Sequence, residues 1–200
     1  MSANLRSKAT HGVIWSAVER YSVQGVQFLL QLVIARILSP HDYGLIGMLA
    51  IFMALSQVFI DGGFSNALIQ KKDRNEDDYC TVFYINLGIS VFIYIILFIC
   101  APFIASFYNQ PLLTPITRIY SLNLIINSLV AVNKVRLVVA VDFKTQSKIS
   151  LGAAVISGIF GIACAYWGMG VWSLVVQMLI NSLLSVILSF YYVKWVPKFI

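Results

Sequence analysis

The chain has 200 residues, of which 60% are hydrophobic and 11% are charged, and its formal net charge is +6. A soluble domain is about 45–50% apolar and about 25% charged, so this composition excludes a soluble domain and predicts an integral membrane protein. The basic balance would also suit a nucleic-acid-binding protein. However, the charges cluster in short connections at alternate ends of apolar segments, as orientation signals do, so we expect no nucleic-acid partner.

Six apolar segments are long enough to cross a bilayer, which requires about 20 mostly apolar residues. They predict an all-α membrane protein that consists of one bundle of six transmembrane helices. The expected spans are about 12–38, 43–69, 80–107, 115–141, 149–167 and 171–193. Ser39-Pro40 should end the first span, because a residue before proline is pushed out of helical geometry. Gly62-Gly63 predicts a local loosening of the second span, and Pro102 predicts a kink or a frayed end in the third.

The positive charges predict how these spans are oriented. On a six-helix path, the Lys and Arg residues near the chain start, near residues 71–74, near 134–148 and near the chain end all fall on one side. The turns near residues 41, 110 and 169 contain neither residue type. By the positive-inside rule we expect a multi-pass protein with both termini of this segment in the cytoplasm.

The first two spans contain polar side chains that a lipid-facing helix would not tolerate. On the first span a band about 80° wide holds five of them. These are Ser16, Arg20, Gln24, Gln27 and Gln31. Glu19 lies on another surface of this helix. If the two spans form an antiparallel hairpin, Arg20 lies level with Asp61, and we expect the pair to interact because unpaired charges at that depth are expensive.

Two later spans have polar faces of the same kind. The fourth span places Tyr120, Asn123, Asn127 and Lys134 on one side, and the sixth repeats Ser173, Gln177, Asn181 and Ser185 every fourth residue. Such residues either bond neighbouring helices or line a water-accessible cavity. For whole bands that include charges we favour the cavity, and a cavity favours transport. In the fifth span Ala154, Gly158, Gly161 and Ala165 form a ridge of small residues that predicts close helix packing.

The remaining chemistry-bearing residues do not suggest an enzyme or a metal protein. The cysteines Cys80, Cys100 and Cys164 have no metal-type spacing, and we expect them to be free thiols. The two histidines flank the first span, so we expect no metal site, no cofactor and no catalytic residues. Neither histidine has an evident orienting partner, and the outer loops are only a few residues long.

Several stretches of the chain match a known family in order and spacing. They are GVIWS at 12–16, LVIARILSPHDYGLIGM at 32–48, DGGFSNALIQKKD at 61–73, VFYINLGIS at 82–90, VDFKTQSKIS at 141–150 and GMGVWSLV at 168–175. Over essentially its whole length the chain resembles the polysaccharide transporter family. That family comprises the O-antigen, capsule and colanic-acid type lipid-linked oligosaccharide flippases of the MATE-like (MOP) exporter superfamily.

The resemblance implies the flipping of an undecaprenyl-diphosphate-linked oligosaccharide across the bacterial inner membrane by alternating access, for surface polysaccharides such as lipopolysaccharide and capsule. Family members have about twelve to fourteen spans in two repeated lobes. We therefore expect this chain to correspond to the N-terminal lobe, with the C-terminal lobe absent. The implied partners are the lipid bilayer, the lipid-linked substrate, the missing lobe and other polysaccharide-assembly membrane proteins.

Roles for the polar residues follow from this interpretation. Arg20, with Lys134 near the cytoplasmic mouth, would hold the diphosphate, since Arg offers a bidentate fork and Lys a point charge. The carboxamides would offer sugar hydroxyls both donors and acceptors. These carboxamides belong to Gln24, Gln27, Gln31, Asn123, Asn127, Gln177 and Asn181. Asp61 or Glu19 would either form a fixed ion pair or take part in coupling, with a proton or sodium as the coupling ion.

Rival functions make different predictions. An ion-coupled small-molecule exporter on the same fold should have a cavity dominated by acidic and aromatic groups. Here the spans contain only Glu19 and Asp61 against Arg20, Arg36 and Arg118, which favours an anionic ligand. A transporter of the peptidoglycan lipid precursor would differ only in head group. A membrane enzyme that works on the same lipid carrier would need a catalytic site. Half a transporter could also serve as a non-transporting scaffold fragment.

Overall fold

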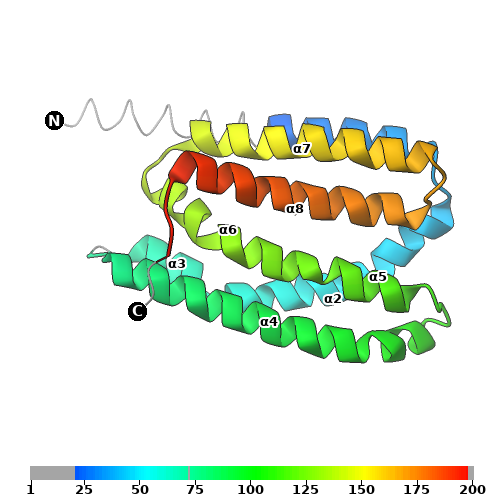
Figure 1. Ribbon diagram of the computed structural model, residues 1–200, viewed down its shortest axis with the longest axis horizontal. Helices are drawn as coiled ribbons and strands as arrows, with labels where there is room; N and C mark the ends of the chain where they lie inside the picture. Colours follow the sequence, from blue (N-terminus) through cyan, green and yellow to red (C-terminus); the bar gives the residue numbers. More distant parts are fainter. Residues whose placement is uncertain (1–20, 72, 198–200) are drawn as a thin grey trace.

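The computed structural model describes residues 21–71 and 73–197, and every regular element in this part of the chain is an α-helix (Figure 1). The first described helix is Tyr21–Ala35. It is followed by α2 (Pro40–Asp61), α3 (Phe64–Gln70), α4 (Glu76–Phe107), α5 (Leu113–Tyr120), α6 (Leu122–Val139), α7 (Phe143–Tyr166) and α8 (Val171–Val193).

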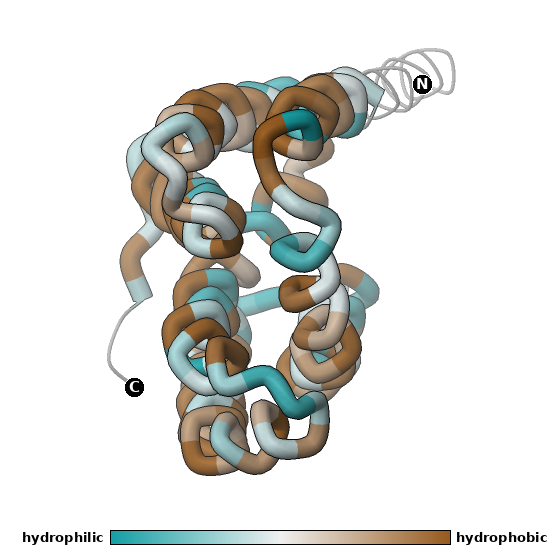
Figure 2. The backbone as a smooth tube through the Cα atoms, turned by 90° about the vertical axis from the view of Figure 1, so that its right-hand side faces the viewer, coloured by the Kyte–Doolittle hydropathy of each residue, from teal (hydrophilic) through white to brown (hydrophobic). Residues whose placement is uncertain are grey.

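Within the described residues, five helical stretches are long and apolar enough to cross a membrane. They are α2, α4, α5 together with α6, α7 and α8, and Tyr21–Ala35 is a shorter apolar helix. Viewed end-on, the helices run side by side along one axis, and hydrophobic residues predominate along them (Figure 2). The protein is therefore an all-α membrane helical bundle, which confirms the predicted fold class.

The connections between helices collect at the two ends of the bundle (Figure 1). One end, named here the basic end, holds residues 62–63, 71, 73–75, 140–142 and 194–197, with exposed Lys71 and Lys194. The opposite end holds residues 36–39, 108–112 and 167–170. The sequence places Arg36 inside the expected first span. The first helix ends at Ala35, however, so Arg36 lies in the turn at the opposite end. The turns at that end are therefore not free of arginine.

The start of α2 shows why the connection between the first two helices is so short. The Ser39 side chain accepts a hydrogen bond from the Asp42 backbone N–H, and the Asp42 carboxylate accepts one from the Ser39 backbone N–H at 3.1 Å. This capping box, with Pro40 at the first helical position, begins the helix three residues before the expected Tyr43.

Two predictions about helix irregularities have different outcomes. Gly62 and Gly63 adopt φ values of +40° and +79°, which only glycine reaches without strain, and they separate α2 from α3. The predicted loosening is thus a complete break, and the expected second span is two helices. Pro102 lies inside α4, which continues to Phe107, so the frayed end is wrong, and the alternative of a kink stays a prediction.

The helices pack in a fixed order across the bundle. α7 packs on α8, α8 on α6, and α6 on α4, with α2 against α4 and α8. Small residues on α7 make the first of these contacts close. A Cβ atom on Gly161 would lie 2.9 Å from the Gln177 Cβ of α8, and one on Gly158 would lie 2.2 Å from the Leu30 Cδ1 of the first helix. The ridge of small residues therefore performs the close packing that the sequence predicts.

The Gly161 contact predicts a selective loss of stability. Gly161→Ala should destabilise the protein by about 1–3 kcal/mol, because the clash includes the Gln177 Cβ and no side-chain rotation relieves it. The matched control is Gly152→Ala on the same helix, whose new methyl would meet the Leu188 Cδ1 at an ordinary 3.5 Å. Thermal unfolding of both variants in detergent measures the difference. Equal unfolding temperatures would contradict the close contact.

Candidate functional site

One face of α2 lines two pockets at different depths of the bundle. Six pocket-lining residues of this helix fall within an arc of about 100° at 100° per residue. They are Tyr43, Ile46, Gly47, Ala50, Gln57 and Asp61. The first four border a pocket toward the opposite end, and the last two border a pocket toward the basic end. The two pockets therefore follow one another along α2.

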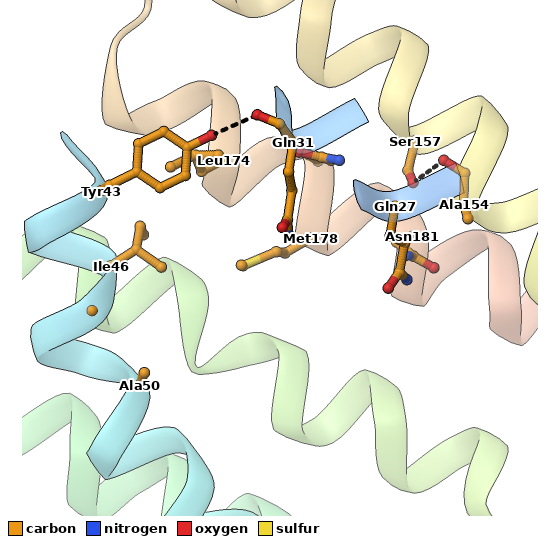
Figure 3. Close-up of a pocket in the computed structure, with 12 residues that line it drawn as sticks. Gln27, Gln31, Tyr43, Ile46, Ala50, Ala154, Ser157, Leu174, Met178 and Asn181 are labelled. Atoms are coloured by element: carbon orange, nitrogen blue, oxygen red, sulfur yellow. Dashed lines mark hydrogen bonds between the residues drawn. The ribbon is translucent and has the colours of Figure 1, made fainter. Parts of the chain in front are cut away.

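The pocket toward the opposite end, named here the amide pocket, has a volume of about 450 Å³. Its lining residues come from the first helix, α2, α7 and α8, and none of them is charged. They are Gln27, Gln31, Tyr43, Ile46, Gly47, Ala50, Ala154, Ser157, Leu174, Gln177, Met178 and Asn181. Figure 3 shows Tyr43, Ile46 and Ala50 on α2 at one side of the pocket and Gln27 and Asn181 at the other.

Local contacts explain how the amides reach this pocket. Gln177 lies directly over Gly161, because glycine has no side chain to occupy the space that Gln177 fills. Leu30 packs into the space over Gly158, which seats the first helix against α7 and carries Gln27 and Gln31 to the pocket. The Tyr43 hydroxyl donates a hydrogen bond of 3.4 Å to the Gln31 backbone carbonyl (Figure 3). The small residues of α7 therefore set the position of the amides.

The pocket toward the basic end, named here the charged pocket, has a volume of about 470 Å³. It contains one acidic and one basic side chain. Its lining residues are Gln57, Asp61, Ser65, Ile69, Asn127, Ala131, Lys134, Val135, Val138 and Gln146.

Hydrogen bonds fix several side chains of the charged pocket. Gln57 Nε2 donates to Asp61 Oδ1 at 3.1 Å, one turn along α2. Ser182 Oγ of α8 donates to Asn127 Oδ1 at 3.3 Å, which ties α6 to α8. Gln146 Oε1 is buried and accepts no hydrogen bond from the described part of the protein. This oxygen is therefore available to a ligand donor or a water molecule.

The predicted site residues divide among several environments. Gln27, Gln31, Gln177 and Asn181 lie in the amide pocket, whereas Asn127, Lys134 and Asp61 lie in the charged pocket. Neither pocket is lined by Gln24, which is exposed, or by Asn123, whose Oδ1 is buried without a hydrogen-bond partner among the described residues. Glu19 and Arg20 lie outside the described residues. The roles assigned to all of these residues stay predictions.

The first two helices do not form the close hairpin that the predicted Arg20–Asp61 pair assumed. They meet near the connection, where Tyr43 bonds to Gln31, but the amide pocket then separates the first helix from α2. In Figure 1 the first helix lies along the upper edge with α7, and α2 lies in the lower half with α4. Within the described part, Asp61 accepts its hydrogen bond from Gln57.

Several residues of the pockets were missed from the sequence. Gln57 lies four residues before Asp61, a spacing that places both on one helix face, so the signal was present. Tyr43 and Gln146 had no signal, because each lies in or beside a polar connection between two apolar segments. Asn86 and Asn133 are fully buried, and their side chains have no hydrogen-bond partner in the part of the chain that the structure describes. They lie on α4 and α6, which pack together.

The described residues offer no ready metal site, because no three His, Cys, Asp or Glu side chains come together there. The sulfurs of Cys80, Cys100 and Cys164 are free thiols, as expected. The polar groups that line the two pockets are thus amides and hydroxyls, which form hydrogen bonds, together with one charge of each sign in the charged pocket.

The comparisons with known proteins decide the family. The family model described as polysaccharide biosynthesis protein matches residues 33–200. The chain belongs to the polysaccharide transporter family. All the sequence motifs named above, except the one at 12–16, lie within or overlap the matched residues.

Curated relatives of this polysaccharide transporter family member come from several bacteria. The lipopolysaccharide biosynthesis protein WzxC of Escherichia coli is 28% identical over 123 residues, 62% of this chain and 25% of WzxC. The succinoglycan biosynthesis transport protein ExoT of Rhizobium meliloti is 24% identical over 191 residues, 96% of this chain and 39% of ExoT. The teichuronic acid biosynthesis protein TuaB of Bacillus subtilis is 26% identical over 94% of this chain and 40% of TuaB.

The chain spans about a quarter to two fifths of the length of these relatives. No solved structure matches it. The names of the relatives are those of transport and biosynthesis proteins for polysaccharides.

The pocket geometry predicts a pattern of water accessibility. In a cysteine-free background, Ala50→Cys in the amide pocket should react with a water-soluble maleimide, whereas Phe103→Cys on the exposed apolar face of α4 should be shielded by lipid. We expect labelling in membranes to be about tenfold faster or more at Ala50→Cys. If Ala50→Cys is labelled as slowly as Phe103→Cys, the amide pocket is closed to water.

Proposed function

We propose that this chain forms one lobe of a transporter that flips an undecaprenyl-diphosphate-linked oligosaccharide across the bacterial inner membrane for surface polysaccharide assembly. The observation that carries the proposal is the amide pocket in a membrane protein of the polysaccharide transporter family. Uncharged donors and acceptors at membrane depth are suited to sugar hydroxyls, which both donate and accept hydrogen bonds.

The amide pocket is matched to a neutral, hydroxyl-rich ligand. Four carboxamides, the Tyr43 hydroxyl and the Ser157 hydroxyl surround a space with an apolar floor that includes Ile46, Leu174 and Met178. Binding sites for small molecules combine such apolar walls with a few convergent polar groups. Because no lining residue is acidic, the amide pocket does not suit the cationic compounds that an acidic drug-type cavity would select. This observation favours the oligosaccharide over a small cationic molecule.

The charged pocket supplies a cation for the diphosphate. Lys134 lines it at the basic end, and we assign its ammonium to the phosphates, with Arg20 as a second cation. Asp61 lies in the same pocket and is held by Gln57. We assign to Asp61, or to Glu19, the role of coupling transport to a proton or to sodium. In this arrangement the diphosphate lies nearer the basic end and the sugars lie deeper in the bundle.

Alternating access requires a second lobe to form the other wall of the cavity. Since the relatives are two and a half to four times longer than the region matched here, we assign that wall to the residues outside this chain. The basic end is assigned to the cytoplasm by the positive-inside rule. Further partners would be membrane proteins of polysaccharide assembly, which supply or consume the lipid-linked unit.

A pair of matched variants tests the amide pocket. Gln27→Leu should lower the rate of flipping of an undecaprenyl-diphosphate oligosaccharide by about two- to tenfold, because each lost hydrogen bond costs about 0.5–1.5 kcal/mol and leaves a sugar group unpaired. The control is Gln24→Leu, on the same helix but outside both pockets. Flipping is measured in proteoliposomes that contain the full-length protein.

The outcomes distinguish the transporter from its rivals. Loss of flipping with Gln27→Leu but not with Gln24→Leu supports sugar binding in the amide pocket. Equal rates for both variants and the unsubstituted protein would overturn the assignment of the pocket. If the unsubstituted protein flips no lipid-linked oligosaccharide but moves a small cation, a small-molecule exporter replaces the proposal, and if it moves neither, a non-transporting scaffold does.

A further inference from the structure

The segment that follows α8 crosses the basic end of the bundle. α8 ends at Val193, and Lys194 adopts a left-handed conformation with φ +50° while its N–H donates to the Phe190 carbonyl at 3.0 Å. Residues 194–197, named here the strap, then run without helical structure from the end of α8 toward the start of α4 (Figure 1). The strap therefore joins two helices from different parts of the bundle.

Trp195 anchors the strap against α4. Its side chain is only 8% exposed, and its Nε1–H donates to Glu76 Oε2 at 2.8 Å. Its ring packs edge-on against the rings of Tyr79 and Phe83, with centroid distances of 6.5 and 6.1 Å. A buried Trp whose N–H has a partner contributes both apolar area and a directed bond. This residue fixes the position of the strap.

An ion pair locks the same site from the side of α6. Arg136 Nη1 donates to both Glu76 Oε1 and Glu76 Oε2 at 3.0 Å. The guanidinium also lies over the rings of Tyr79 and Trp195, 4.9 and 5.4 Å from their centroids. Charge-assisted bonds and cation–π contacts reinforce each other here, because one carboxylate accepts from both the Arg and the Trp. The strap, α4 and α6 are thus held by one cluster.

The residues that pack around Trp195 also form part of the wall of the charged pocket. Trp195 belongs to a buried cluster with residues of α3, α4 and α6, namely Leu68, Tyr79, Cys80, Phe83, Val132 and Val135. Val135 of this cluster lines the charged pocket as well, and so does Ile69, the residue after Leu68. Removing Trp195 would therefore leave space directly behind α3 and α6.

We propose that Trp195 is a latch that couples the strap to the charged pocket. When Trp195 is seated, α3 and α6 are held together and the pocket keeps its width. When the indole leaves this position, α3 loses its support and the pocket widens. The latch does not depend on which ligand the pocket takes, so it extends beyond the proposed function.

The native cysteines provide the test. Cys80 is 2% exposed and belongs to the cluster around Trp195, whereas Cys164 is 8% exposed on α7 and lies outside it. Two proteins are prepared, one with Cys80 and one with Cys164 as the sole cysteine. Trp195→Ala should raise the maleimide labelling rate of Cys80 by about tenfold or more and leave that of Cys164 unchanged, because only the local cluster opens. Trp195→Phe, which keeps a ring in the seat, should give a smaller increase.

A second readout reports on the pocket itself. Ser65→Cys on α3 lines the charged pocket, and Ala50→Cys lines the amide pocket. In a cysteine-free background Trp195→Ala should speed the labelling of Ser65→Cys but not of Ala50→Cys. Unchanged Cys80 labelling would overturn the latch, and a parallel rise at Cys80 and Cys164 would overturn it in favour of general loosening. Faster Cys80 labelling with no change at Ser65→Cys would overturn the coupling to the pocket.

Discussion

The arrangement of this protein depends on one constraint, which is that a bilayer core offers no water to polar groups. Polar side chains inside the bundle therefore tend to be bonded to protein or gathered around a pocket. Ser56, Thr117 and Ser157 donate to backbone carbonyls of their own helices, and Ser90 pairs with Ser128 between α4 and α6 at 3.0 Å. Four of the carboxamides instead line the amide pocket on the inner face of α2. The same constraint thus stabilises the bundle and creates the site.

Close packing on α7 connects the fold to the site. Because Gly158 and Gly161 have no side chains, Leu30 and Gln177 approach the α7 backbone, and the first helix and α8 are brought around a common space. At the basic end a different cluster serves the same purpose. There Glu76, Arg136 and Trp195 join the end of α8 to α4 and α6 behind the charged pocket. Each pocket therefore has its own structural support.

Much of the fold could be predicted from the sequence, since long apolar segments leave few arrangements except membrane helices. The polar stripe of α8 and part of the stripe of the first helix also identified residues of the amide pocket. The expected close packing of the first two helices is not found along their described lengths, because the amide pocket lies between them. Trp195 gave no signal, because a tryptophan near the end of an apolar segment usually marks the membrane interface. Its burial depends on Glu76 and Arg136, which are distant in sequence.

The central claim is that the sugar part of a lipid-linked oligosaccharide lies against the inner face of α2. Photo-crosslinking tests it most directly. A benzophenone amino acid is placed at Ala50, which lines the amide pocket, or at Phe103, which is exposed on α4, and the complete protein is irradiated with a radiolabelled undecaprenyl-diphosphate oligosaccharide. We expect an adduct through the sugar at Ala50 and none through the sugar at Phe103. An adduct formed only at Phe103, or equally at both positions, would contradict the claim.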